Sequence, residues 1–257
     1  MSSPSFRLLT SIRYDPRLLD ADWNTRVNDG VPTPVMLLPY HRDRLVHAAQ
    51  QHGWSLGTLS AQSLSAACEQ AVKDSGADLT RNPAFKIRAL LAQDGTLTVT
   101  ADVLPTSSPR DLLVPSGDPS DIRTLHIDPE PTPSSLFTAT KTTHRPHYNA
   151  SRARIGLSPI PSPRDSHIDV LLHTPDGRIT ETSIRNVAFQ RGGQWITPHT
   201  SSGCLPGVMR RYLIEQGTWV EAGDGELLVD GIGDGELVMT ANGVEGCCTS
   251  RVVSPTV

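Results

Sequence analysis

The chain has 257 residues, 37% of them hydrophobic and 19% charged, which is enough apolar material for an ordinary core. The formal net charge is −4 and no dense basic stripe appears, which disfavours nucleic-acid binding. No secretory signal and no run of about 18 apolar residues occurs, so we expect a soluble, cytoplasmic protein without a membrane partner. The four cysteines form no CxxC pair, and we expect reduced thiols and no metal site.

The first hundred residues predict a strand, two helices and a hairpin. Apolar residues recur at helical spacing in two stretches, and Gly53 is a natural stop for the first helix. The dipeptide Asp94-Gly95 is a strong turn signal between two β-like runs. The expected order suits a small α+β domain over residues 1–106, with a strand at 6–14, helices at 39–53 and 62–73, and strands at 85–92 and 96–103.

A segment rich in Pro, Ser and Asp at 107–120 predicts an interdomain linker. The remainder, 121–257, is β-rich, with a single predicted helix that opens at Pro206-Gly207 and runs to about residue 216. We therefore expect a larger β-barrel-like domain, with strands at 124–127, 167–173, 186–190, 194–197, 236–240 and 249–253. No dinucleotide-binding glycine motif and no P-loop motif occurs in this pattern.

Lysine is scarce in this chain. Only Lys73, Lys86 and Lys141 are present, and the other twenty basic residues are Arg. A lysine amine can form an imine with an aldehyde, which a guanidinium cannot do. Lys141 lies in a short polar segment, ATKTTHRPHY at 139–148, and its local sequence alone is more typical of a surface lysine.

Four segments together resemble fold-type IV enzymes that use pyridoxal phosphate (PLP), the group of branched-chain and D-amino-acid aminotransferases and aminodeoxychorismate lyases. They are LPYHRDRL at 38–45, ATKTTHRPHY at 139–148, GRITETSIRNVAF at 177–189 followed by SSGCLPGVMRR at 201–211, and MTANGVEG at 239–246. The resemblance covers almost the whole chain. It implies a two-domain α+β fold with a small N-terminal domain and a β-barrel-like C-terminal domain, PLP as cofactor, a small-molecule amino substrate and a homodimer.

The resemblance also assigns roles to individual residues. It implies that Lys141 forms the Schiff base and later moves the substrate proton, and that Glu181 keeps the ring nitrogen of PLP protonated. A phosphate dianion favours a guanidinium and the N–H groups at a helix start. The matching residues are Arg44 for the guanidinium, Val208 and Met209 for the helix start, and Asn242 with Gly243 for a second phosphate-side turn.

Two departures from the family pattern bear on the phosphate. Met209 stands where relatives often have Thr, and Gly243 where they often have Ser or Thr, so we expect backbone contacts alone at both positions. Arg88 could meet a substrate carboxylate or form a cross-strand ion pair, and Arg145 could line the substrate site. His41, His144 and Tyr148 are as well explained by packing as by chemistry.

The PLP elements do not by themselves define the reaction. The KTTHR run and the TANGVEG segment look more like the lyase branch, especially its fungal-type members, which make 4-aminobenzoate for folate synthesis. Aminotransferases of the group typically have a tyrosine five residues after the lysine, where this chain has Pro146. We therefore expect an aminodeoxychorismate lyase. The alternatives are an aminotransferase for a D-amino acid, a branched-chain amino acid or an amine, and a PLP-holding relative without activity.

Overall fold

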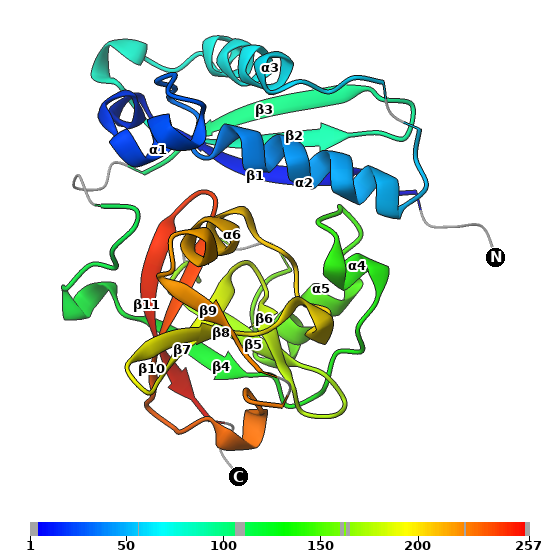
Figure 1. Cartoon of the computed structure of the whole chain (residues 1–257), viewed down its shortest axis with the longest axis vertical. Coiled ribbons are helices and arrows are strands. Elements are labelled where there is room, and N and C mark those ends of the chain that lie inside the picture. The colour runs from blue at the N-terminus through cyan, green and yellow to red at the C-terminus, as the bar shows by residue number, and fades with distance from the viewer. Residues whose placement is uncertain are drawn as a thin grey trace. The chain divides into compact units, whose positions relative to one another are not determined.

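The computed structural model describes residues 5–55, 57–105, 111–159, 162, 165–223 and 225–254 (Figure 1). The chain forms two compact units. The N-terminal unit comprises Met1–Pro109 together with Lys141–His144, and the C-terminal unit comprises Arg110–Thr140 and Arg145–Val257. The predicted linker at 107–120 lies partly outside the described residues. No helix in the described part of the chain is long and apolar enough to cross a membrane.

The N-terminal unit is a three-stranded antiparallel sheet with two long helices on one face (Figure 1). Its sheet order is β1 (Leu8–Tyr14), β2 (Phe85–Leu91) and β3 (Leu97–Val103), and the helices are α2 (Leu38–Gln51) and α3 (Ala61–Asp74), preceded by the short α1 (Asp22–Val27). Alternate residues of β2 are buried, and Ile87 packs with Ile12 and Leu64 in the core beneath the helices. The strand, helix, helix, strand, strand order agrees with the sequence prediction; the short α1 was not predicted.

The C-terminal unit contains one eight-stranded sheet that curls into a half-barrel around its own core (Figure 1). Leu125, Val187 and Phe189 are among the fully buried residues of that core. The strand order is β6 (Ile179–Thr182), β5 (Ile168–His173), β4 (Arg123–Ile127), β11 (Gly246–Val253), β10 (Leu237–Asn242), β7 (Asn186–Arg191), β8 (Gln194–Thr197) and β9 (Trp219–Glu221). The expected barrel-like architecture is confirmed.

The C-terminal unit also contains helices α4 (Leu136–Ala139), α5 (Pro146–Arg154) and α6 (Val208–Glu215). Only α6 was predicted from the sequence. Helix α5 has no apolar stripe, because its buried residues are Tyr148, Ser151 and Arg152. Polar contacts hold it in place: Arg152 donates to the Ser158 carbonyl at 2.6 Å and to the Ser183 hydroxyl at 3.1 Å. A search for apolar periodicity cannot find such a helix.

The Lys141–His144 segment is separated in sequence from the rest of the N-terminal unit but pairs with β1. The Leu9 N–H donates to the Lys141 carbonyl at 2.8 Å, and the Thr143 N–H donates to the Arg7 carbonyl at 2.9 Å. Thr142 forms an antiparallel bridge with Leu8. The backbone that carries Lys141 is therefore fixed by the first strand of the sheet, although the residue lies in the range 121–257 that the sequence assigns to the second domain.

Candidate active site

In the N-terminal unit, the Thr10 hydroxyl joins two side chains of helix α2. His41 and Arg44 lie on adjacent turns of the helix, and Thr10 points to the same face of the sheet as the core residue Ile12. Arg44 Nη2 donates to Thr10 Oγ1, and Thr10 Oγ1 lies 2.7 Å from His41 Nδ1. Arg44 Nη2 also lies 3.3 Å from His41 Nδ1, so the three side chains form one polar cluster.

His41 is fully buried in this cluster. Burial lowers the pKa of His41 well below its ordinary value, and the positive charges of Arg44 and Lys141 lower it further. The imidazole is therefore neutral at physiological pH. The cluster therefore places two cationic groups that the sequence analysis singled out, the Lys141 amine and the Arg44 guanidinium, beside an uncharged histidine.

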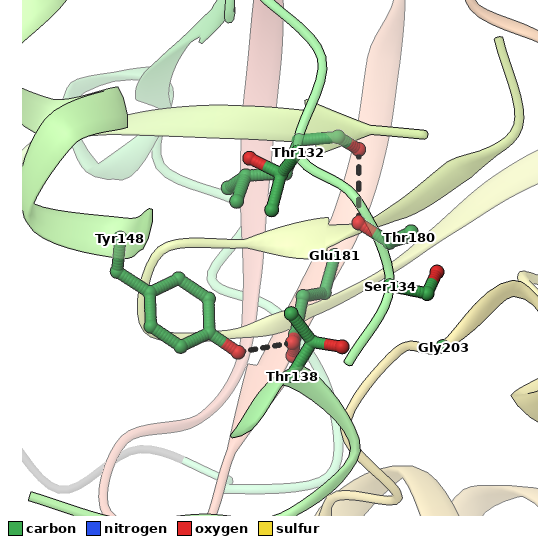
Figure 2. A pocket seen from close by; sticks show the side chains of 8 residues that line it. Thr132, Ser134, Thr138, Tyr148, Thr180, Glu181 and Gly203 are labelled. Atoms are coloured by element: carbon green, nitrogen blue, oxygen red, sulfur yellow. Dashed lines mark hydrogen bonds between the residues drawn. The ribbon is translucent and has the colours of Figure 1, made fainter. Parts of the chain in front are cut away.

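In the C-terminal unit, Glu181 lies on β6, all four residues of which are buried. Its carboxylate is 4% exposed, so it is not the surface residue that a strand-end glutamate usually is. Oxygen Oε1 accepts from the Tyr148 hydroxyl at 2.5 Å and from the Leu205 N–H at 3.2 Å. Figure 2 shows the hydrogen bond from Tyr148 in a pocket lined by Thr132, Ser134, Thr138, Tyr148, Leu172, Thr180, Glu181 and Gly203.

The Tyr148 hydroxyl is a permanent donor to this carboxylate. Burial and the neighbouring charge of Glu181 raise the pKa of Tyr148 well above its ordinary value, so the phenol keeps its proton. The contact brings the predicted residue Glu181 together with α5, an element that the sequence did not predict.

Asn186 joins Glu181 to the start of helix α6. Its Nδ2 donates to the Leu205 carbonyl at 2.8 Å and lies 3.5 Å from Glu181 Oε2. A Cβ atom at Gly207 would collide with the Asn186 amide, so only glycine allows this close approach before the helix begins. The side chains of Val208 and Met209 are buried, and their N–H groups are in the first turn, where a helix has no internal acceptors. That arrangement suits an anion.

The Asn242-Gly243 turn connects β10 to β11. Asn242 Oδ1 accepts from the N–H groups of Val244 and Glu245 at 2.9 and 2.8 Å, so the side chain shapes its own turn. Glu245 then pairs with Arg185, and with Arg123 at 2.7 Å. Burial raises the pKa of Glu245, but Arg185 and Arg123 outweigh it and hold that pKa well below the ordinary value.

The turn also lies beside the other predicted residues of this unit. β10 runs next to β7, with Ala241 opposite Asn186. Within the C-terminal unit, the structure thus brings Glu181, the start of α6 and the Asn242-Gly243 turn to neighbouring places.

The two arginines predicted for substrate binding differ in their surroundings. Arg145 is half-buried, with its guanidinium 4.6 Å from the centre of the Tyr148 ring and its Nη2 donating to the Ser183 carbonyl at 2.8 Å. Arg88 is exposed on β2, opposite Ser11, on the face of the sheet that does not carry Thr10. Within the N-terminal unit, the structure does not bring Arg88 together with Arg44.

Several residues in these contacts were not predicted from the sequence. Thr10 gave no signal, and Tyr148 was assigned to packing as readily as to chemistry. Asp169 in β5 and Arg185 directly before β7 form an ion pair at 3.0 Å, and each carries a recognisable signal as a charged residue within or beside a buried strand. No group of three potential metal ligands occurs among the residues that the structure describes.

The chain is similar in sequence to known proteins. The sequence model of the family described as amino-transferase class IV matches residues 24–249. The "Putative aminodeoxychorismate lyase" of Schizosaccharomyces pombe is 42% identical over 85 residues, which are 33% of this chain and 37% of that protein. The aminodeoxychorismate lyase of Saccharomyces cerevisiae is 34% identical over 140 residues, covering 49% of this chain and 36% of that protein. The matches thus span little more than a third of either relative.

Solved structures share the fold at low sequence identity. A "Putative amino-acid aminotransferase" from Mesorhizobium loti is 22% identical with a TM-score of 0.68, covering 96% of this chain and 100% of that chain. A "Putative 4-amino-4-deoxychorismate lyase" from Legionella pneumophila is 16% identical with a TM-score of 0.64, covering 96% and 82%. An aminotransferase from Brucella abortus, solved with PLP, is 16% identical with a TM-score of 0.64, covering 96% and 81%. These likenesses confirm the predicted fold type.

Proposed function

The chain belongs to the amino-transferase class IV family, and from this premise we propose that it cleaves 4-amino-4-deoxychorismate to 4-aminobenzoate and pyruvate. Its cofactor is pyridoxal phosphate, as in the Brucella abortus aminotransferase. Its substrate is a small amino compound. We further propose that the protein acts in the cytoplasm as a homodimer.

The donor sets in the two units fit this cofactor in charge and in hydrogen-bonding character. In the N-terminal unit, Lys141 would supply the amine that attaches the cofactor, and Arg44 would meet the phosphate. In the C-terminal unit, the buried carboxylate of Glu181 would accept from the ring nitrogen. The N–H groups of Val208 and Met209 at the start of α6, and the backbone of the Asn242-Gly243 turn, would hold the phosphate.

The chemistry then depends on one mobile proton. Bound PLP supplies an electron sink for the substrate carbon that carries the amine. The freed amine of Lys141 would take the proton from that carbon on its Nζ atom, return it to the departing enolpyruvate group and then recapture the cofactor as the aromatic amine leaves. The Glu181 carboxylate would hold a proton on the ring nitrogen, and the Arg44 guanidinium would hold the phosphate end. Aromatisation of the ring drives the cleavage.

The observation that carries the lyase proposal is the similarity to the two fungal proteins named as aminodeoxychorismate lyases. The KTTHR sequence at 141–145 supports it, as does Pro146 at the position where aminotransferases of this group typically have tyrosine. In this chain Pro146 is the first residue of helix α5, which positions Tyr148 on Glu181. An aminotransferase activity is the second candidate, because the matching family model and several structural neighbours bear that name.

A single incubation separates the two candidates. The purified protein with PLP is mixed with 4-amino-4-deoxychorismate and no keto acid, and 4-aminobenzoate and pyruvate are quantified. We expect both products in equal amounts. Absence of product, together with steady amino transfer from D-alanine, branched-chain amino acids or an amine to a keto acid, would reject the lyase proposal.

The role of Lys141 is tested by reduction of the PLP-loaded protein with borohydride, followed by peptide mapping. We expect a single pyridoxyl adduct on Lys141 and none on Lys73 or Lys86. An adduct on either of those two residues would reject the assignment.

A further inference from the structure

The contacts around Glu181 assign a role to two residues of α5 and its N-terminus. We propose that Arg145 and Tyr148 are positioning residues that act on the cofactor through Glu181, with Arg145 acting on the Tyr148 ring and Tyr148 on the carboxylate. This inference rests on the proposed role of Glu181 at the ring nitrogen of PLP. It assigns to Arg145 a function other than the substrate contact that the sequence suggested.

The Tyr148 contact fixes one oxygen of the carboxylate. Oε1 of Glu181 accepts both the phenol proton, at 2.5 Å, and the Leu205 N–H, at 3.2 Å. The two donors come from different elements, helix α5 and the loop before α6, so together they prevent the carboxylate from rotating. Both groups are buried, where a hydrogen bond to a charged group is strong. The second oxygen, Oε2, is thereby oriented for the cofactor.

Arg145 is held on the Tyr148 ring by a second contact. Its guanidinium carbon lies 4.6 Å from the ring centre, and its Nη2 is anchored on the Ser183 carbonyl at 2.8 Å. A cation over the face of a phenol draws electron density from the ring and makes the hydroxyl a better donor. The positive charge also favours the ionised form of the nearby carboxylate. Burial lowers the pKa of Arg145, and the negative charges of Glu181 and Asp169 oppose that effect.

These contacts have a consequence for the cofactor. A carboxylate that is oriented and held in its ionised form keeps the proton on the ring nitrogen of PLP. If the Tyr148 hydroxyl is removed, Glu181 loses a donor and an anchor, the ring nitrogen holds its proton less firmly, and the cofactor binds more weakly. A positive ring nitrogen also lowers the pH at which the proton leaves the cofactor–lysine linkage. The visible absorbance of the cofactor changes when this linkage loses its proton. The pH midpoint of that absorbance change should therefore be higher in such a variant.

The experiment needs no substrate. The protein is stripped of PLP and retitrated, and the visible absorbance of the reloaded protein is followed against pH. We expect Tyr148→Phe to weaken PLP binding by about 10- to 100-fold, the range for a hydrogen bond to a charged group, and to raise the absorbance midpoint. Arg145→Met should change both quantities in the same direction by a smaller factor, and Arg145→Lys should restore part of the change. The double variant should be no worse than Tyr148→Phe alone.

Tyr14→Phe is the matched control. Tyr14 packs edge-on against Phe85 in the N-terminal unit, and its replacement should leave both readouts at wild-type values. A Tyr148→Phe protein with an unaltered PLP affinity and midpoint would overturn the proposal. So would an Arg145→Met protein, folded as judged by circular dichroism, that changes only the KM for substrate. If the wild-type chain bound PLP but made no 4-aminobenzoate, the lyase proposal would fail while this test stayed valid.

Discussion

The two units hold their candidate site residues with different kinds of interaction. In the N-terminal unit, Arg44 and His41 meet at the uncharged hydroxyl of Thr10. In the C-terminal unit, the residues around Glu181 and the Asn242-Gly243 turn are braced by ion pairs, among them Arg185 with Asp169 and Glu245. An arginine that is proposed to bind a phosphate dianion can be oriented by a neutral hydroxyl. The Asn242-Gly243 turn, from which we expect only backbone contacts to the phosphate, can instead be held in place by ion pairs whose charges cancel.

The ion pair between Arg185 and Asp169 is also deeply buried. The Arg185 side chain is 2% exposed and the Asp169 side chain 6%. Asp169 further accepts from the hydroxyls of Thr182, the last residue of β6, and Ser183, the first residue after it. Glu181 precedes these residues on β6 and Asn186 begins β7, so the contacts of Asp169 fix the turn between the two. The four predictions that follow test this contrast in decreasing order of expected effect.

The largest effect is expected at Lys141. Replacement by alanine removes the amine that we propose attaches the cofactor and moves the proton, and product formation should fall by about 10³-fold or more. The initial rate of 4-aminobenzoate release is the measurement, and Lys86→Ala, an exposed lysine on β2, is the control. Activity within tenfold of wild type would remove Lys141 from the reaction.

The second prediction concerns stability. Arg185→Met leaves Asp169 and Glu245 without their shared buried partner and should lower the free energy of unfolding by about 3–5 kcal/mol. Urea unfolding followed by circular dichroism measures the change. The control is Arg81→Met in the N-terminal unit, whose ion pair with Asp78 is exposed to solvent and should contribute little to stability. Equal losses in the two variants would contradict the contrast between the units.

The sequence predicted the fold and most of the proposed ligands of the cofactor, for a physical reason. Strands and long helices have periodic apolar faces, and residues such as Lys141, Glu181 and Arg44 occur in short motifs of fixed spacing. The supporting contacts have neither property. Thr10 meets Arg44 across 34 positions of the chain and Tyr148 meets Glu181 across 33, so only the folded chain shows that they are partners.

Helix α5 illustrates the same limit. It is held by polar contacts of Arg152 and by Tyr148, and its sequence has no apolar stripe that would reveal it. Its position nevertheless decides which hydroxyl meets Glu181. Contacts that join distant segments through single polar groups are the part of a site that periodicity and motif spacing do not encode.

The third prediction returns to the N-terminal unit. Thr10→Val keeps the shape of the side chain but removes the hydroxyl that orients Arg44, and PLP affinity should fall by about tenfold. Thr10→Ser retains the hydroxyl and should bind PLP nearly as well as the wild type. Titration of the two stripped variants with PLP measures the difference. If valine and serine behaved alike, the hydroxyl would have no part in orienting Arg44.

The pH dependence of stability separates the two units as well. The folded-state pKa of Glu245 is depressed, so its contribution is present above the unfolded value near 4.3 and is lost as the pH falls through the folded value. The folded-state pKa of His41 is also depressed, but for a histidine this means that the folded chain holds the neutral form of the side chain. The unfolded chain binds a proton on His41 below about pH 6.5 while the folded chain does not, so stability declines as the pH falls below that value.

The smallest predicted effect follows from this difference. Between pH 7 and pH 5.5, the proton linked to His41 should lower the stability of the wild type by about 1 kcal/mol, and His41→Gln should lack that part of the decline. Urea unfolding at both pH values measures it, and the difference between the two proteins cancels the other histidines, including His52, whose pKa is also lowered by burial. An equal decline in both proteins would mean that His41 is protonated in the folded chain. The groups that contact Arg44 would then include a charged imidazole, and the contrast between the units would disappear.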